Sequence, residues 1–401
     1  MRVKALTIVA VALILATSAW AAVSESVLYS FLTQSGDGYY PYASLISDKS
    51  GNLYGTTYYG GANSYYGAVF ELSPSGSGWN ETVLYSFTGK PDGQAPYGSL
   101  VFDKAGNLYG TTYYGGVSNY GTVFELKHSG SSWKESVLYS FTGTNGDGAY
   151  PLAGLVFDAK GNLYGTTYAG GKGYGTAFEL KPSKSGKWTV ATSYSFLAGT
   201  DGAYPQYGAL IAGKGGYFYG TTLSGGGTYN VGTVYELFLA RGVLVEKPIF
   251  SFSGGNAGTY PYAGVALDAK GNLYGTTYQG GSANSGIAYR LNKSKKWSES
   301  VLHSFTGGTD GAYLYSAVAL DAKDNVYGTT YQGGTSSVGT VFKLTLTNGK
   351  YKESVLYSFK NSGGDGLYPR AGVILDSKGN LYGTTLYGGI KNGGSVFEVT
   401  P

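Results

Sequence analysis

A pentapeptide of the form Leu/Phe/Val-Tyr-Gly-Thr-Thr recurs seven times along this chain, and its spacing constrains the fold more than any other feature. Successive copies are 55 residues apart, except for one interval of 53 residues. The tyrosines of the seven copies are Tyr54, Tyr109, Tyr164, Tyr219, Tyr274, Tyr327 and Tyr382. A constant period of this length indicates one supersecondary unit repeated in register. Every candidate functional group is therefore expected in several near-equivalent copies.

The first residues have the features of a secretory leader. Arg2 and Lys4 precede an apolar run over residues 5–20, and Ala19-Trp20-Ala21 fits a small-x-small cleavage site. A membrane-spanning helix needs roughly 20 apolar residues, more than this run provides. We therefore expect a signal peptide over residues 1–21 and a mature chain over residues 22–401 that is secreted, to the extracellular space or the periplasm. No second apolar run predicts a membrane span in the mature chain.

Charge and composition exclude several classes of partner. The chain has 28 basic and 24 acidic side chains and no basic run, so we expect no nucleic-acid partner. It has no cysteine, so its stability cannot depend on disulfides, and an exported domain of this size can bury a core of its own. Chains with 68 glycines and 41 tyrosines can be disordered, but here the glycines recur at constant positions between strand-like segments. The composition is therefore that of an ordered repeat protein.

Each repeat has the pattern of four short β-strands. In the second unit we expect strands over residues 99–103, 108–113, 122–126 and 133–141, where β-branched and aromatic residues predominate. Gly, Asn and Asp in the intervening segments indicate turns and one longer loop. Four antiparallel strands in a repeat of this length are typical of a β-propeller blade, so seven units predict seven blades.

The two ends of the chain predict that the blades form a closed ring. Val27-Leu28-Tyr29-Ser30-Phe31 has the sequence of a fourth strand with no blade before it, and residues 395–399 have that of a third strand with no fourth strand after it. Pairing of the two would complete the last blade and remove an exposed sheet edge. An open solenoid, the alternative, needs polar caps at both ends. We therefore expect an all-β, seven-bladed β-propeller that is one domain and a monomer.

The repeated motifs also resemble a known family. Gly-Asn-Leu-Tyr-Gly-Thr-Thr at residues 51–57, 106–112, 161–167 and 271–277, Gly-Thr-Val-Phe-Glu-Leu at 121–126, and Val-Leu-Tyr-Ser-Phe-Thr-Gly at 83–89 and 137–143 are similar to the GloVer tandem repeat. The resemblance, to GloVer-containing choice-of-anchor proteins and more weakly to the NHL class of propellers, implies a bacterial exported protein and no particular activity. Such proteins often carry a C-terminal anchor, which we do not expect here because the sequence closes with a strand.

Two kinds of connection carry the candidate binding residues. Because successive strands are antiparallel, the fourth-to-first and second-to-third connections of every blade emerge on one face of the ring. The candidate ligand-binding residues on this face are Tyr58, Tyr113, Tyr168, Tyr278, Tyr331, Asp37, Asp92, Asp147, Asp201, Asp310 and Asp365. Tyrosine rings can lie against the C–H faces of sugars, and carboxylates accept hydroxyl protons. The alternative is structural, in which Asp-Gly closes a turn and each tyrosine packs between blades.

Other repeated polar residues point to structure rather than chemistry. Asp48, Asp103, Asp158, Asp268, Asp321 and Asp376 each stand before Gly-Asn or a close variant, and we expect them to cap turns, since a calcium site needs several oxygen ligands close together. Glu71, Glu125, Glu179, Glu236 and Glu398 share one third-strand position, where we expect a solvated face. His128 and His303 lie in different units, so we expect no catalytic triad, metal site or cofactor.

Three functional hypotheses remain open on the sequence alone. The first is a secreted, non-catalytic propeller that binds an extracellular partner, for example a polysaccharide, through the Tyr/Asp/Gly-rich loop face. The second is a structural or adhesive protein of the cell envelope. The third is a lyase or hydrolase with a site in the channel mouth, and it predicts an asymmetric cluster in the fourth and fifth units. Those units diverge at Gln206, Gly213, Ala257 and Arg290, a divergence that drift explains equally well.

Overall fold

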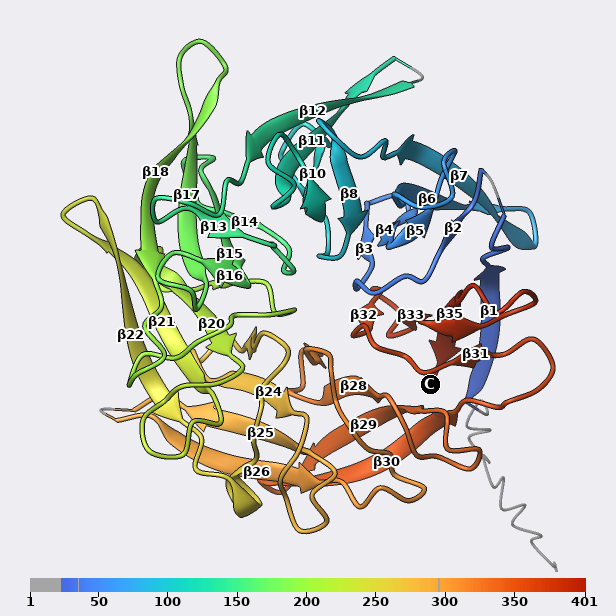
Figure 1. The fold of residues 1–401 in the computed structure, drawn as a ribbon. Helices are drawn as coiled ribbons and strands as arrows, with labels where there is room; N and C mark the ends of the chain where they lie inside the picture. The colour runs from blue at the N-terminus through green and yellow to red at the C-terminus, as the bar shows by residue number, and fades with distance from the viewer. Residues whose placement is uncertain (1–22, 35, 131, 295) are drawn as a thin grey trace, which may run out of the picture.

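The computed structural model shows a ring of seven antiparallel sheets arranged around a central channel (Figure 1). It describes residues 23–34, 36–130, 132–294 and 296–401, so the expected signal peptide lies outside the described residues. Within these ranges no helix is long and apolar enough to cross a membrane. The only helical segments in the described chain are two 3₁₀ turns, η1 (Lys214–Gly216) and η2 (Gly255–Ala257).

Each blade has four strands, which follow one another from the channel outward. Blade 1 contains β3 (Ile46–Ser47), β4 (Leu53–Thr57), β6 (Ala68–Ser75) and β7 (Gly78–Ser86), and blade 2 contains β9 (Val101–Phe102), β10 (Leu108–Gly115), β11 (Thr122–Ser129) and β12 (Ser132–Ser140). Blade 3 contains β14 (Val156–Phe157), β15 (Leu163–Thr167), β17 (Thr176–Pro182) and β18 (Trp188–Ser195), and blade 4 contains β19 (Ile211–Ala212), β20 (Phe218–Thr222), β21 (Thr233–Ala240) and β22 (Val243–Ser251). Blade 5 contains β23 (Ala266–Leu267), β24 (Leu273–Thr277), β25 (Ile287–Asn292) and β26 (Ser298–Ser304), and blade 6 contains β27 (Ala319–Leu320), β28 (Val326–Thr330), β29 (Thr340–Thr347) and β30 (Lys350–Ser358). Blade 7 contains β32 (Ile374–Leu375), β33 (Leu381–Thr385), β35 (Ser395–Thr400) and β1 (Ser24–Ser30).

The ring closes as the ends of the sequence predict. Strand β1 pairs antiparallel with β35, with Val27 opposite Phe397, and the two strands lie side by side at opposite ends of the colour range in Figure 1. A hydrogen bond from Thr384 Oγ1 to the carbonyl of Ala43 (3.2 Å) also joins blade 7 to blade 1. Because β1 covers the edge of β35, no long unpaired edge remains there. The all-β, seven-bladed propeller is therefore confirmed.

The core lies between neighbouring blades rather than within a blade. The second strand, Leu-Tyr-Gly-Thr-Thr, is buried because each sheet is covered on both faces. Its glycine is required: a Cβ at Gly55 would lie 2.6 Å from Phe70 Cζ, so the ring of Phe70 lies against bare backbone. On the other side Tyr54 of blade 1 packs with Phe124 and Leu126 of blade 2. Stacked sheets of this kind can bury apolar surface only as neighbours in a ring.

The first strand of each blade is shorter than the sequence predicts. In blade 2, Val101–Phe102 pair with β10, whereas the residues before them lie against the neighbouring blade. A Cβ at Gly98 would lie 2.5 Å from the carbonyl carbon of Ala153, so backbones of adjacent blades meet directly at the channel. Thr111 Oγ1 donates a hydrogen bond across the same boundary to the Ala153 carbonyl (2.9 Å). Equivalent bonds join Thr56 to Gly98, Thr221 to Ala263, Thr276 to Ser316 and Thr329 to Ala371.

Two expectations about acidic residues have different outcomes. The turn-capping role of the Asp-x-x-Gly-Asn motif is confirmed, since Asp103 Oδ1 accepts the N–H groups of Ala105 (2.8 Å) and Asn107 (2.9 Å). The solvated third-strand face is wrong for Glu179, which is fully buried. It lies directly opposite Tyr164 in the strand register, and its Oε1 accepts a hydrogen bond from the Tyr164 hydroxyl, with 2.5 Å between the two oxygens.

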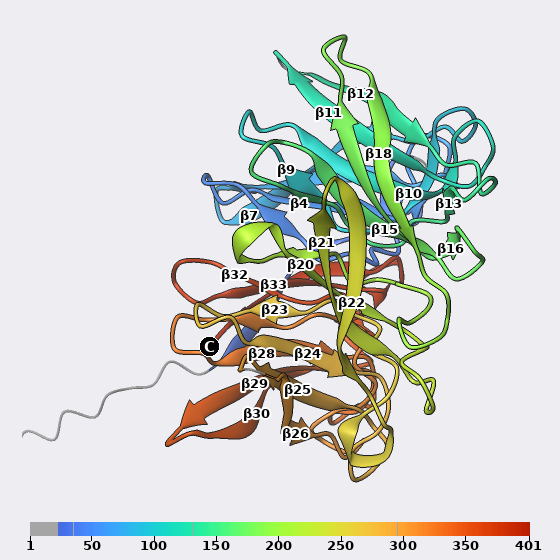
Figure 2. The same cartoon turned by 90° about the vertical axis from the view of Figure 1, so that its left-hand side faces the viewer.

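The two kinds of loop that carry the candidate residues do share one face. Their backbones pair with each other in short strands: β2 (Gly38–Tyr39) with β5 (Tyr59–Gly60), β13 (Gly148–Ala149) with β16 (Ala169–Gly170), β31 (Gly366–Leu367) with β34 (Tyr387–Gly388), and β8 (Gly93–Pro96) with β10. In the side view of Figure 2, β13 and β16 lie at one face of the ring. We call this face the loop face.

Candidate binding site at the mouth of the channel

The six aspartates of the Asp-Gly motif lie on the loop face, and their carboxylates bind the ends of the outer strands. Asp92 accepts hydrogen bonds from the hydroxyl of Tyr85 (2.9 Å) and from the N–H of Thr88 (2.9 Å), which ties the end of the outer strand β7 to the turn. An equivalent hydrogen bond from a backbone N–H is accepted by Asp37, Asp147, Asp201, Asp310 and Asp365. The carboxylates therefore anchor outer strands, and their oxygens are largely occupied by the chain itself.

A histidine takes the place of tyrosine in one of these anchors. His303 Nε2 lies 3.2 Å from Asp310 Oδ2, at the position where Tyr85 meets Asp92. The imidazole thus preserves a structural hydrogen bond of the repeat. In the fifth unit, where Ala257 replaces the aspartate, the 3₁₀ turn η2 makes the connection instead.

The five candidate tyrosines, which we call the rim tyrosines, lie around the channel mouth, and their rings contact other tyrosines. The ring of Tyr58 is 5.4 Å from that of Tyr42, and the ring of Tyr331 is 5.2 Å from that of Tyr315, measured between centroids. Tyr113 and Tyr168 stack beside Tyr150 and Tyr204, and Tyr278 beside Tyr313. Burial raises the pKa of Tyr113 to about 12, so its hydroxyl stays protonated at neutral pH and can donate a hydrogen bond.

A second group of tyrosines lies in the channel mouth, and we call it the tyrosine layer. It comprises Tyr42, Tyr97, Tyr207, Tyr262 and Tyr315, all half-buried. Their ring centroids follow one another at 4.4, 5.0, 5.8 and 5.1 Å, so the rings form a continuous arc. Each comes from a different blade, at the position just before the inner strand. Three of the four ring pairs are stacked, and stacked rings at these separations attract one another beyond their buried area.

The arc is completed by a cation. The blade 7 residue at the equivalent position is Arg370, whose guanidinium carbon lies 5.1 Å from the ring centroid of Tyr42, 4.9 Å from that of Tyr207 and 4.6 Å from that of Tyr315. Its Nη2 donates a hydrogen bond to the Tyr207 hydroxyl (2.9 Å). Arg370 thus reaches across the channel from blade 7 to blade 4. In blade 3 the equivalent residue is Leu152, and there Tyr97 stacks directly on Tyr207.

A third set of loop-face tyrosines has a strained backbone that hydrogen bonds hold in place. Six tyrosines that follow Asp-Gly or its equivalent have φ between 56° and 60°, a region that non-glycine residues rarely occupy: Tyr40, Tyr150, Tyr204, Tyr260, Tyr313 and Tyr368. Tyr150 is fixed from both sides, because its N–H donates to the Tyr120 carbonyl (2.8 Å) and its carbonyl accepts from Tyr168 N–H (3.0 Å). Strained residues that their surroundings over-determine concentrate at binding and catalytic sites.

Exposed apolar side chains gather in the second-to-third loops of the same face. Five of these loops each present one such side chain: Tyr65, Val117, Tyr174, Tyr229 and Ile390. Val117 and Ile390 are 75% and 74% exposed, which is high for β-branched residues on a folded protein. The loop face therefore combines a tyrosine-lined mouth with a ring of solvent-exposed apolar tips.

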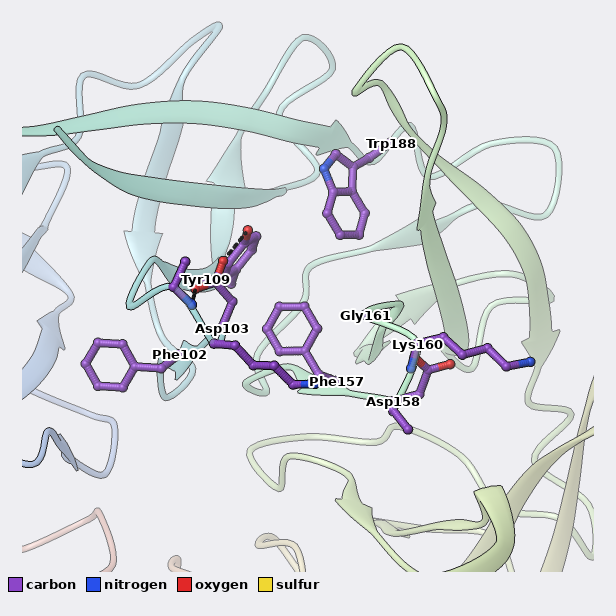
Figure 3. Close-up of a pocket in the computed structure, with 11 residues that line it drawn as sticks. Phe102, Asp103, Tyr109, Phe157, Asp158, Lys160, Gly161 and Trp188 are labelled. Carbon is purple, nitrogen blue, oxygen red and sulfur yellow. Dashed lines mark hydrogen bonds between the residues drawn. The ribbon is translucent and has the colours of Figure 1, made fainter.

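Grooves between blades hollow the opposite face. One, with a cavity of about 420 Å³, lies between blades 2 and 3 and is bordered by Phe157, Trp188 and Tyr109 (Figure 3). A similar groove between blades 1 and 2 is bordered by Tyr54 and Trp133. The carboxylates of Asp103 and Asp158 in these grooves cap their own turns. The grooves offer aromatic walls with lysine side chains at their borders, Lys104 and Lys160 in the first and Lys49 and Lys104 in the second.

The rim tyrosines could be placed at the mouth from the sequence, whereas the tyrosine layer and Arg370 were missed. Aligning the seven repeats at the residue before Ala43 gives Tyr, Tyr, Leu, Tyr, Tyr, Tyr and Arg, so the substitution is visible in the sequence. What the sequence does not show is that these positions converge on one axis. In the described chain, no group of three or more His, Asp or Glu side chains is arranged to hold a metal ion.

Comparison with known proteins agrees with the fold. Curated proteins give no match. A protein from Lactobacillus plantarum is similar in structure at 13% identity, with a TM-score of 0.52 over 80% of this chain and 85% of that one. A putative 6-phosphogluconolactonase from Bacteroides uniformis is similar at 12% identity, with a TM-score of 0.52 over 79% of this chain and 84% of that one. Such low identities show a shared fold alone. The Gloeobacter/Verrucomicrobia repeat model matches residues 17–235 and 206–401, and the chain therefore belongs to the Gloeobacter/Verrucomicrobia repeat family.

Proposed function

We propose that this protein is a secreted, non-catalytic propeller that binds an extracellular partner, a polysaccharide above all, on its loop face. The observation that carries the proposal is the continuous arc of half-buried tyrosine rings across the channel mouth. Half-buried tyrosines offer an apolar surface with polar hydroxyl groups, the combination that sugar rings require.

The hydrogen bonds of the candidate residues indicate different roles for the aspartates and the tyrosines. The Asp-Gly carboxylates are engaged with the outer strands, so they support the loops rather than meet the ligand. Contact with the ligand falls to the tyrosine layer, to the rim tyrosines beside it and to exposed tips such as Tyr65 and Tyr229. Rigid aromatic side chains lose little entropy on binding, which favours them as contact residues.

The proposal includes export, because the protein must leave the cytoplasm to bind an extracellular polymer. Its support is the leader pattern of residues 1–21. Detection of the mature chain outside the cytoplasm, with Ala22 at or near its N-terminus, is the expected result. A full-length chain retained in the cytoplasm would contradict this part.

Binding is tested with the mature protein on an array of bacterial and plant polysaccharides. We expect one glycan class to bind, and the variants Tyr58→Ala, Tyr113→Ala and Tyr168→Ala each to weaken binding at least several-fold, because each removes a ring from the rim. Trp188→Ala is the matched control, since it removes an aromatic side chain from the opposite face. No binding by any glycan, or equal losses from Trp188→Ala, would contradict the proposal.

A further inference from the structure

Arg370 is a half-buried cation without an anionic partner in the described chain. The carboxylates that pair with cations there meet Lys181, Lys270 and His303 and not Arg370. The guanidinium makes one hydrogen bond, to the Tyr207 hydroxyl, and its Nε is buried with no acceptor. Three tyrosine faces stabilise the charge, but a cation–π contact leaves the N–H groups in the guanidinium plane unsatisfied. The fork of donors is therefore available to a planar anion.

The surroundings cannot supply that anion themselves. Burial raises the pKa of Tyr42 to about 12 and that of Tyr97 further above its ordinary value, so these hydroxyls are neutral at physiological pH. Retaining an unpaired charge at a partly desolvated position is costly unless a counter-charge arrives. Because the other blades hold tyrosine or leucine here, the repeat does not require an arginine for folding.

A cavity beside Arg370 has room for a small ligand. It measures about 240 Å³ and follows the channel from the tyrosine layer along the inner strands, with Ser44, Ser99 and Ser316 among the residues that line it. Among the described residues, Arg370 is the one charged side chain that lines it. A single cation balances a singly charged carboxylate but leaves a phosphate dianion partly uncompensated.

We propose that the channel cavity binds a carboxylate, the acid group of a sugar acid, through Arg370. The planar carboxylate accepts two parallel hydrogen bonds from the guanidinium, and the sugar ring lies against the tyrosine layer. The ligand class rests on the proposed function, since a uronic acid is the anionic form of the polysaccharide residue expected at the loop face. The anion site itself rests only on Arg370 and its cavity.

The test is calorimetric titration of the mature protein with sodium glucuronate, with glucose, acetate and inorganic phosphate as separate arms. We expect glucuronate to bind, acetate to bind more weakly, and glucose and phosphate to bind less than either. Arg370→Tyr installs the residue that most blades carry, and it should weaken glucuronate binding roughly 10- to 100-fold, the range for losing a charge-assisted hydrogen-bond pair. Arg370→Lys keeps the charge without the planar fork and should lie between. Arg370→Gln serves as a second neutral variant, and circular dichroism confirms folding of each.

The outcomes separate this inference from the proposed function. Absence of glucuronate binding, preference for phosphate, or undiminished binding by both neutral variants would overturn the carboxylate site. If neutral polysaccharides still bound and Tyr113→Ala still weakened them, the proposed function would stand without it. Glucuronate binding that needs Arg370, in a protein that binds no polymer on the array, would support the site and contradict the polysaccharide role.

Discussion

Raising the pH should destabilise this propeller, and the reason lies in six glutamates of the outer strands. Glu25, Glu81, Glu135, Glu246, Glu299 and Glu353 occupy equivalent positions, and each has one carboxyl oxygen buried without a hydrogen-bond partner. Burial, with a smaller contribution from nearby Asp201, raises the pKa of Glu246 to about 8, although a hydrogen bond with the Tyr194 hydroxyl opposes the shift. Burial likewise raises the pKa of Glu135 to about 8 and that of Glu81 to about 7. The native ring therefore holds these groups in their protonated form at mildly acid pH.

The direction of the pH effect follows from proton binding. An unfolded chain releases these protons near pH 4.5, whereas the folded chain keeps them until about pH 7 to 8. Between these limits the folded state binds more protons, so stability falls as pH rises. The contribution is complete below pH 4.5 and is lost by about pH 8. Titration of other groups adds to this profile but does not change its sign for the glutamates.

The magnitude can be worked out for Glu246, which is 8% exposed. A pKa of about 8 in place of 4.5 corresponds to a ceiling of about 5 kcal/mol. Relaxation and water penetration at the outer edge of the ring reduce the effect, and we expect about 1–3 kcal/mol. Glu246→Gln keeps the shape of the protonated acid and cannot ionise. The variant should therefore match the native protein at pH 5 and exceed its stability by this amount at pH 9.

The assay is guanidinium unfolding at pH 5, 6, 7, 8 and 9 for the native protein and for Glu246→Gln. Glu236→Gln, on the third strand of the same blade, is the matched control for replacing a glutamate by its amide. Stability that stays constant or rises from pH 5 to pH 9 would refute the reasoning. So would a Glu246→Gln protein with the same pH dependence as the native one.

Three further predictions address the ring itself. Thr111→Val should lower the free energy of unfolding by about 1–2 kcal/mol, because it leaves the Ala153 carbonyl without its hydrogen-bond donor. Thr166→Val should be neutral or stabilising, because Thr166 Oγ1 has no partner to lose. Chemical denaturation curves of the two variants and the native protein measure both changes. Val27→Pro removes a backbone N–H donor from β1 opposite Phe397. Size-exclusion chromatography should then show aggregation, or thermal melting a melting temperature several degrees lower. An unchanged protein would mean that its stability does not depend on closure of the ring. Asp92→Ala should cost about 2–3 kcal/mol in unfolding free energy, since a buried acceptor of the Tyr85 hydroxyl and the Thr88 amide is lost; a smaller loss than for Thr111→Val would count against the anchor.

The fold could be predicted because period and strand pattern repeat the same information seven times. Gly55 illustrates why. A Cβ at this position would collide with the ring of Phe70, so the glycine of the pentapeptide is required by the packing of the blade. The length of the inner strand could not be predicted, because close approach of Gly98 to Ala153 depends on the neighbouring blade. Glu179 was misplaced for a similar reason, since its hydrogen bond to Tyr164 requires the strand register.

The candidate site was predictable only where the repeat is regular. The rim tyrosines recur at one position of each unit, and a shared face follows from antiparallel strands. The role of the Asp-Gly carboxylates was open between two interpretations, because the motif is compatible with either a turn or a ligand contact. Arg370 shows most clearly what the sequence cannot predict. The arginine is visible in one repeat, but the rings that it contacts come from blades 1, 4 and 6, and only the structure brings them together.

Ring geometry explains why asymmetry at the axis has consequences that asymmetry at the rim does not. On the outer edge, equivalent residues of different blades are too far apart to meet, so the change of Tyr to His303 alters one local bond. At the axis all seven blades converge, so Leu152 lets Tyr97 stack on Tyr207, and Arg370 then contacts three rings at once. The extra residue Gln206 lies beside the same position, with a buried oxygen that has no partner, and Thr166 of the preceding blade has lost the cross-blade bond that Thr111 keeps. A few substitutions are therefore enough to make the axis asymmetric, and the carboxylate site that we propose lies where Arg370 meets the rings of three other blades.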